Sequence, residues 1–217
     1  MRAAVVVFTL AIALAAPPAA ATSALVGHYR LAEGPDVAGE LVIAPDGRFG
    51  YVLAAGALDE RAQGTWRAEG ERVCLTTEPK PVPPAFRKLA PAAAASDAKE
   101  APTILVTWPG GRGVAGVNFT LGFASGDPIE DYTQEYGWTL PEGEARAPHW
   151  VELREPIHGI ISPRYELTRE DGPFVRAEIV PNDIGVVDFA GACFEKAAKA
   201  FVLHRREGDM RFVRVQE

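Results

Sequence analysis

The chain has 217 residues, 22 Lys and Arg against 29 Asp and Glu, a formal net charge of −7 and 47% hydrophobic residues. A net acidic chain whose basic residues form no cluster repels phosphate backbones, which argues against a nucleic-acid partner. The apolar content, which includes four Trp, is enough for a folded core and excludes disorder of the whole chain.

The first 21 residues have the order of a secretory leader. Arg2 supplies a short positive region, an unbroken apolar run follows over 3–16, and small residues occupy 19–21. The run is shorter than the roughly 20 residues that a membrane-spanning helix needs. We therefore expect a signal peptide over 1–21. Its cleavage would leave a periplasmic or secreted protein with a net charge of −8 and no membrane span.

Residues 22–77 are predicted to form an antiparallel β-meander. Short runs of strand-forming residues, several with alternating apolar and polar positions, cover 27–31, 40–44, 48–53, 64–67 and 72–77. Pro45-Asp46-Gly47 is a hairpin signal, because Pro presets φ and Gly accepts a positive φ. A sheet this small leaves one face uncovered, so we expect the meander to pack on another element.

Residues 78–102 break this pattern. The segment holds six prolines and the run Ala92 to Ala95. Proline removes a backbone donor and fixes φ, so the segment is interpreted as an extended Pro/Ala-rich linker.

Residues 103–217 return to strand patterns. Runs are expected over 103–108, 114–123, 136–140, 150–153, 164–168 and 174–180, followed by a closing hairpin over 200–205 and 210–215. Their spacing is typical of a β-sandwich. The predicted fold class is thus all-β, with a small N-terminal antiparallel meander and a C-terminal β-sandwich over 103–217.

One stretch of the second half resembles a known family. Gly111-Arg112-Gly113-Val114-Ala115-Gly116-Val117-Asn118-Phe119-Thr120-Leu121 is followed by Thr133-Gln134-Glu135-Tyr136-Gly137-Trp138-Thr139-Leu140-Pro141. Together they resemble the carboxypeptidase regulatory-like (transthyretin-like) β-sandwich. Gly113 and Gln134 stand where that family usually has Pro and Asp. The resemblance implies a non-catalytic accessory module of the bacterial envelope, and the meander resembles part of a lipocalin-like module; such analogies imply fold more than function.

The two cysteines, Cys74 and Cys193, are expected to form a disulfide in an oxidising compartment. In the run 72–76 the apolar residues Val73 and Leu75 share one face of the predicted strand, and Cys74 lies on the other. Its thiol is therefore expected to face solvent or a neighbouring element, and a bond would tie distant parts of the chain together.

No catalytic residues are assigned, because no nucleophile signature is present. Four serines follow the leader, at positions 23, 96, 125 and 162, and none has a Gly-x-Ser-x-Gly setting. The sequence leaves open whether the protein is an enzyme but favours a protein that is not one, and no cofactor is assigned. A hydrolase site assembled from scattered acids and histidines is the least favoured alternative, since geometry rather than spacing defines such sites.

Candidate binding residues are aromatic and lie in the second half. They are Trp108, Trp138, Trp150, Tyr132 and Tyr136, which could line a sugar-binding or apolar face or else belong to the core. His149 and His158 bracket Glu152 and Glu155 and are weak candidates for a metal site, since their spacing matches no zinc signature.

These observations favour an exported, non-catalytic binding or interaction module of the cell envelope, with an envelope protein or a glycan as partner. The alternative is a small-ligand carrier, in which the meander and later strands close one barrel around an apolar pocket.

Overall fold

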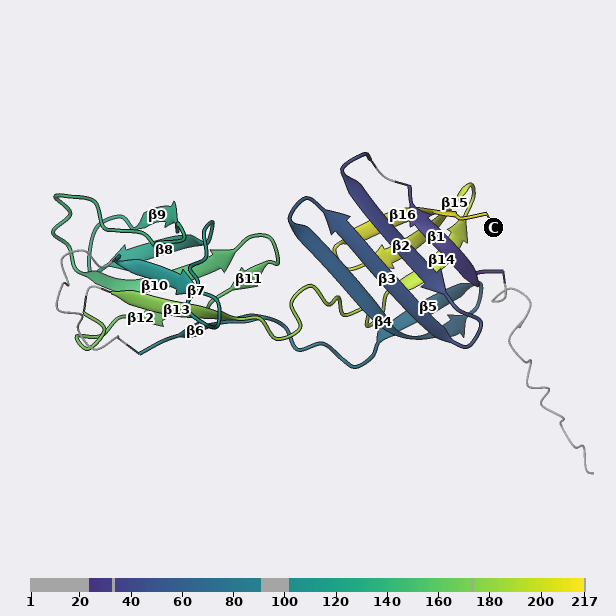
Figure 1. Ribbon diagram of the computed structural model, residues 1–217, viewed down its shortest axis with the longest axis horizontal. Helices are drawn as coiled ribbons and strands as arrows, with labels where there is room; N and C mark the ends of the chain where they lie inside the picture. The colour runs from purple at the N-terminus through teal and green to yellow at the C-terminus, as the bar shows by residue number, and fades with distance from the viewer. Residues whose placement is uncertain (1–23, 33, 91–101, 173, 217) are drawn as a thin grey trace, which may run out of the picture.

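The computed structural model describes residues 24–32, 34–90, 102–172 and 174–216. The expected signal peptide over 1–21 and residues 91–101 of the expected linker lie outside the described residues. The described chain is all-β, as predicted, and forms two lobes joined by two connections (Figure 1). In these ranges no helix has the length and apolar character needed to cross a membrane.

The first lobe is a closed antiparallel barrel with strand order β1-β16-β15-β14-β5-β4-β3-β2. Its strands are β1 (Gly27–Leu31), β2 (Val37–Ile43), β3 (Arg48–Ala55), β4 (Leu58–Glu69), β5 (Arg72–Thr77), β14 (Cys193–Ala197), β15 (Ala200–Arg205) and β16 (Gly208–Arg214). The first and last strands pair, with Tyr29 opposite Arg214. The C-terminal strands, expected in the sandwich, therefore close the barrel with the meander, because this pairing covers the apolar face that the meander leaves exposed.

The second lobe contains two sheets. The larger sheet has the order β11-β10-β8-β9, with β12 also on β10, and the smaller sheet has the order β6-β13-β7. The strands are β6 (Ala85–Lys88), β7 (Ile104–Thr107), β8 (Asn118–Phe123), β9 (Ile129–Tyr132), β10 (Pro148–Glu155), β11 (Ile160–Ile161), β12 (Tyr165–Glu166) and β13 (Val175–Val180).

Two expectations for this lobe are corrected. The expected linker contributes β6, because residues 85–88 lie between prolines and can pair with β13 while burying Phe86. Residues 136–140 form no strand. Gly137 adopts a φ of +92° in a tight turn that starts at Gln134, and Trp138 makes only an isolated bridge with Ile104.

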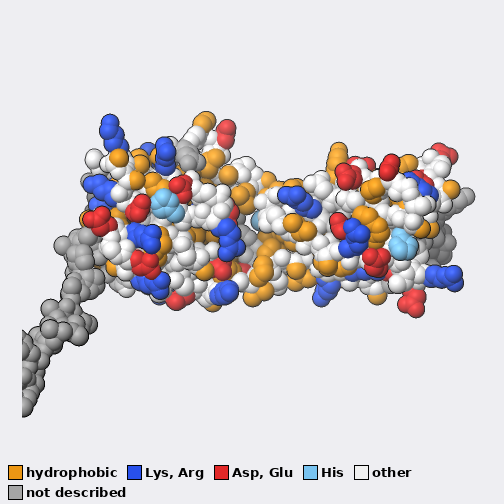
Figure 2. Space-filling model, turned by 180° about the vertical axis from the view of Figure 1, so that it is seen from behind, with side chains coloured by type: hydrophobic (Ala, Val, Ile, Leu, Met, Phe, Trp, Pro, Cys, Tyr) orange, Lys and Arg blue, Asp and Glu red, His pale blue; other side chains and the backbone are white. Residues whose placement is uncertain are grey.

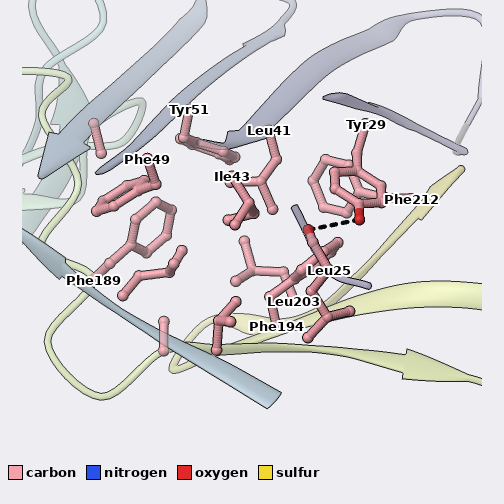
Figure 3. Close-up of a cluster of buried hydrophobic side chains, with 14 of the residues drawn as sticks. Leu25, Tyr29, Leu41, Ile43, Phe49, Tyr51, Phe189, Phe194, Leu203 and Phe212 are labelled. Atoms are coloured by element: carbon pink, nitrogen blue, oxygen red, sulfur yellow. Dashed lines mark hydrogen bonds between the residues drawn. The ribbon is translucent and has the colours of Figure 1, made fainter. Parts of the chain in front are cut away.

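The barrel interior is filled by side chains. Alternate residues of each strand point inward, as the pattern over 48–53 predicts for Phe49, Tyr51 and Leu53. Figure 3 shows aromatic rings and aliphatic side chains meeting across the barrel, with the Tyr29 hydroxyl donating a hydrogen bond to the Leu25 carbonyl at 2.8 Å. An eight-stranded barrel has an interior that side chains of this size can fill.

The two sheets of the second lobe share one core. The larger sheet contributes Phe119 and Leu121 of β8 and Val151 and Leu153 of β10 to this core. The smaller sheet contributes residues of β6, β7 and β13. Along β10 the buried positions alternate with more exposed ones, because one face of this strand points into the core and the other points away from it.

A disulfide joins Cys74 of β5 to Cys193 of β14, confirming the expected pairing. The two residues are direct cross-strand partners, and only one other residue pair, Phe194 with Val73, is in register between these strands. Val73 and Leu75 point into the core and Cys74 points outward, as the alternation predicted. The bond therefore lies at a short seam of the barrel.

Candidate functional site

An open groove of about 580 Å³ lies on the outside of the barrel. Its floor is the outer face of β2, β3 and β4, and its walls are the two connections that lead to the second lobe and back. We call it the waist groove and define it by Val42, Gly50, Val52, Pro79, Pro81 and Val186. The lobes meet at a narrowed waist, where hydrophobic side chains also gather on the opposite side of the molecule (Figure 2).

Hydrogen bonds fix the walls of the groove. The returning connection lies along β4, where the Arg61 N–H donates to the Gly185 carbonyl and the Val187 N–H donates to the Arg61 carbonyl. The outgoing connection is held where the Glu78 N–H donates to the Gln63 carbonyl at 2.9 Å. The two connections also bind each other, because the Val82 N–H donates to the Asp183 carboxylate at 2.8 Å. The groove is thus preformed.

The floor is apolar and uncovered. Val42 and Val52 are 40% and 50% exposed, although both are β-branched strand residues. Gly50 lies between them in the sheet, opposite Val42 on β2 and Gln63 on β4. A Cβ atom at Gly50 would meet nothing within 4 Å, so neither packing nor a left-handed backbone explains this glycine. Glycine inside a strand weakens it and often marks the close approach of a ligand or another backbone.

Polar groups border this floor on both sides. Glu40, Val52 and Arg61 form one cross-strand row, so opposite charges flank the valine. The Glu40 carboxylate is 3.2 Å from His28 Nε2. The side chains of Arg61 and Gln63 have no hydrogen-bond partner among the described residues, and both are free to bind polar groups of a ligand.

A second cleft, of about 490 Å³, lies between the barrel and the turn after β10. On the barrel side Arg205 binds the Glu60 carboxylate at 2.8 Å and the Tyr51 hydroxyl at 2.8 Å, and Tyr51 donates to Glu60 at 3.0 Å. Burial, followed by the negative charge of Glu60, raises the pKa of Tyr51 well above its usual value, so this phenol stays protonated at neutral pH. It can donate a hydrogen bond but cannot act as a base.

The other side of this cleft carries the expected metal candidate His158. Its Nδ1 is 3.2 Å from the buried Glu155 carboxylate, which also accepts the backbone N–H groups of Ile157 and His158. Glu155 thus closes the hairpin turn. A carboxylate–histidine pair can orient a general base, but Ser162 is buried and accepts the Leu153 N–H, so it is unavailable as a nucleophile.

The two histidines named as metal candidates lie apart. His149 is near the start of β10, 3.7 Å from Glu166, and both side chains are largely exposed. His158 follows the other end of the same strand. Among the described residues, the one group of three ligand-type side chains within reach of a single ion is Glu69, Cys74 and Cys193. Its two sulfurs are joined in the disulfide, so they are not thiolate ligands.

The aromatic candidates divide into two sets. Trp108 and Trp138 pack against the core of the second lobe, and the Trp138 indole donates to Asp131. Tyr132 and Trp150 lie on the outer face of the larger sheet, and Tyr136, 79% exposed, lies on a turn. The structure therefore does not gather all five into one aromatic face.

Sequence reasoning missed the waist groove. Its floor residues belong to ordinary alternating strands, and its walls come from segments about 100 residues apart that the sequence does not pair. The one available signal was Gly50, a glycine inside a strongly β-prone run without any turn residue beside it.

These features define an eight-stranded barrel protein with a second β lobe inserted between β5 and β14, and with a preformed groove where the two meet. No protein-family model, curated protein or solved structure matches this chain.

Proposed function

We propose that the protein is an exported, non-catalytic binding module of the bacterial cell envelope, and that it binds an extended apolar segment of another envelope protein in the waist groove. The leader pattern supports the location. We also propose that the second lobe is a transthyretin-like sandwich, which its two facing sheets and shared core support.

The observation that carries the binding proposal is the uncovered floor at Gly50. Two exposed valines flank a glycine that leaves the backbone bare, inside a groove whose walls are already in place. Exposed apolar surface of this kind marks interaction sites, and a groove of this volume is within the range of binding sites. Arg61 and Gln63 would bond the peptide groups of the bound segment.

The carrier alternative receives less support. It needs a hollow barrel, whereas the interior is occupied by Tyr29, Phe194 and Phe212, each fully buried. The hydrolase alternative is supported only by the Glu155–His158 pair, which has no nucleophile beside it among the described residues.

Site-specific photo-crosslinking in intact cells tests the proposal. A benzophenone amino acid at Val52 is expected to give one protein adduct of defined mass, and Gly50→Trp, which fills the floor, is expected to abolish it. The same photoreactive residue at Tyr136, which is exposed but outside the groove, serves as the matched control. Equal crosslinking at both positions, or an adduct that survives Gly50→Trp, would show that the groove is not the binding site.

A further inference from the structure

The outer face of the larger sheet carries two rows of cross-strand neighbours. The first row is Tyr132, Asn118, Arg154 and Ile161. The second row is Glu130, Thr120 and Glu152, and the side chain of Arg164 is hydrogen-bonded to Glu152. A hollow of about 600 Å³ lies over these rows. The strand order β9-β8-β10-β11 places the residues side by side across the sheet (Figure 1).

Most polar groups on this face are unused by the protein. The side chains of Asn118, Thr120, Glu130 and Arg154 make no hydrogen bond or ion pair to any described residue. By contrast, the adjacent Glu152 accepts a 2.8 Å hydrogen bond from Arg164 Nε. Four unpaired polar side chains thus surround the hollow, and they include both donors and acceptors.

The charged groups around this hollow are nearly balanced. Glu130 and Arg154 contribute one charge of each sign, and Glu152 and Arg164 neutralise each other. Asp131 also lines the hollow and adds one negative charge, but its carboxylate already accepts the Tyr132 N–H and the Trp138 indole N–H. An anionic ligand would therefore meet no excess of positive charge here. Hydroxyl groups, which donate and accept at once, match such a mixed set of donors and acceptors.

Two aromatic residues lie on this face of the sheet in different surroundings. The Tyr132 ring is 52% exposed at one end of its row. The Trp150 ring lies directly over Gly122, where a Cβ atom would come within 1.9 Å of it, and the Arg164 guanidinium covers the ring at 3.8 Å. Trp150 is thus packed against the sheet and is not among the residues that line the hollow, whereas Tyr132 lines it and offers an apolar surface on which a sugar ring can pack.

We infer that this face binds a neutral oligosaccharide, with Asn118, Thr120, Glu130 and Arg154 bonding its hydroxyl groups and Tyr132 packing against one sugar ring. This site shares no residue with the waist groove and does not depend on the binding function proposed for it. The protein would then hold a glycan with one lobe and a protein segment beside the other.

Titration calorimetry and amide NMR of the full mature chain test the inference, with maltohexaose, cellohexaose and chitohexaose as neutral probes and polygalacturonate as an anionic one. At least one neutral probe is expected to bind and to shift the amide signals of β8, β9 and β10. Asn118→Ala and Arg154→Ala are each expected to weaken binding about tenfold, as loss of one hydrogen bond to a charged or strongly polar group does.

Tyr136→Ala is the matched control, because this exposed tyrosine lies off the face and should leave affinity unchanged. Gly50→Trp is a second control that fills the waist groove and should not affect sugar binding. The inference is wrong if no neutral probe binds, if only polygalacturonate binds, or if Asn118→Ala and Arg154→Ala bind like the unmodified chain. None of these results bears on crosslinking at Val52.

Discussion

Gly50 and Gly122 are both glycines within strands, but their surroundings differ. Packing requires a glycine at Gly122 and does not require one at Gly50. Gly122 is required, because Trp150 lies over it, whereas the Cβ of any residue at Gly50 would point into open space. Both lie within paired strands, so the intrinsic strand propensity is that of glycine in each case. The difference lies only in what each side chain would touch.

We therefore expect Gly50→Ala and Gly122→Ala to change stability in opposite directions. Gly50→Ala should stabilise the protein by about 0.5–1 kcal/mol, since alanine loses less conformational entropy on folding. Gly122→Ala should destabilise it by about 1–3 kcal/mol through overpacking against Trp150. Urea unfolding of both variants measures the difference. Stabilisation by Gly122→Ala would contradict the stacked position of the indole.

His204 is a second residue whose surroundings lead to a testable prediction, here for the pH dependence of stability. Its Nδ1 is 2.8 Å from Asp209 and its Nε2 is 3.3 Å from Glu195, so one imidazole links three neighbouring strands. The hydrogen bond with Asp209, assisted by Glu195, raises the pKa of His204 above its usual value. The charged form is thus favoured in the folded protein.

A raised folded-state pKa stabilises the protein below the unfolded pKa of about 6.5, and this contribution is lost as the pH rises through the folded pKa. The unfolding free energy of the unmodified chain should therefore exceed that of His204→Gln most at about pH 5 to 6, with the gap narrowing toward pH 9. The effect should be small, because the imidazole is 43% exposed. A gap that widens with increasing pH would show that the neutral imidazole is the stabilising form.

At the scale of elements, the β5–β14 seam has few backbone pairs and one covalent bond. Cys74 and Cys193 are 119 residues apart in sequence, and their Cα atoms are 4.0 Å apart. Chain-entropy arguments give a large stabilisation for closing so long a loop, because the open unfolded chain has many more conformations.

The double variant Cys74→Ser/Cys193→Ser is expected to lose up to about 5 kcal/mol of stability. Denaturant unfolding measures this loss, and the unmodified chain with a reductant should move toward the same midpoint. Arg67→Ala, which removes a solvent-exposed partner of Glu69 near the seam, should leave the midpoint nearly unchanged. An equally stable double variant would show that backbone pairing alone holds the seam.

Local patterns predicted much of this fold, and long-range pairing accounts for what they missed. The hairpin at Pro45-Asp46-Gly47 follows from turn chemistry and the strand Arg72–Thr77 from alternation, and the disulfide agrees with the pairing expected for the two cysteines. A closed barrel was not expected as the main architecture, because the meander and the C-terminal hairpin each have a complete strand pattern that does not reveal their pairing with each other. Proline density concealed β6, whose four residues pair with a strand about 90 residues away.

The candidate site was less predictable than the fold. Of the aromatic residues expected to face a ligand, the structure places Tyr132 beside a hollow and Trp150 over Gly122 on the same sheet, while Trp108 and Trp138 pack on the core. Aromatic residue type does not reveal burial, since strands place alternate residues on opposite faces. The register that decides it depends on partners far away in sequence.

At the scale of the whole molecule, the second lobe is an insertion with neighbouring entry and exit points. Thr77 on the outgoing side accepts the Phe189 N–H at 3.0 Å, although the two residues are more than 100 positions apart. The backbone N–H of Glu78 donates to the Gln63 carbonyl, and that of Val187 donates to the Arg61 carbonyl. Gln63 and Arg61 are two residues apart on β4, so the two ends of the insertion are held roughly 7 Å apart along this strand. A short turn can span this gap.

Replacing residues 79–186 by a four-residue Gly/Ser turn should therefore leave a folded barrel with its disulfide intact. Amide NMR should show dispersed signals for β1 to β5 and β14 to β16, and mass spectrometry should show a two-hydrogen difference on reduction. A chain that ends at residue 190 retains the lobe but lacks β14 to β16, and we expect its barrel part to be unfolded. A folded barrel in that truncated chain would contradict the observed closure.

The pairing of β1 with β16 also has a consequence in time. During synthesis β1 cannot complete its pairing until β16 is present, because Tyr29 and Arg214 are direct neighbours in the sheet. A chain that emerges from its N-terminus first exposes five strands with an unclosed edge, while the second lobe, whose strands all lie within 85–180, becomes complete earlier. The inserted lobe can thus be finished before the barrel that carries it, and completion of the barrel depends on the arrival of β16.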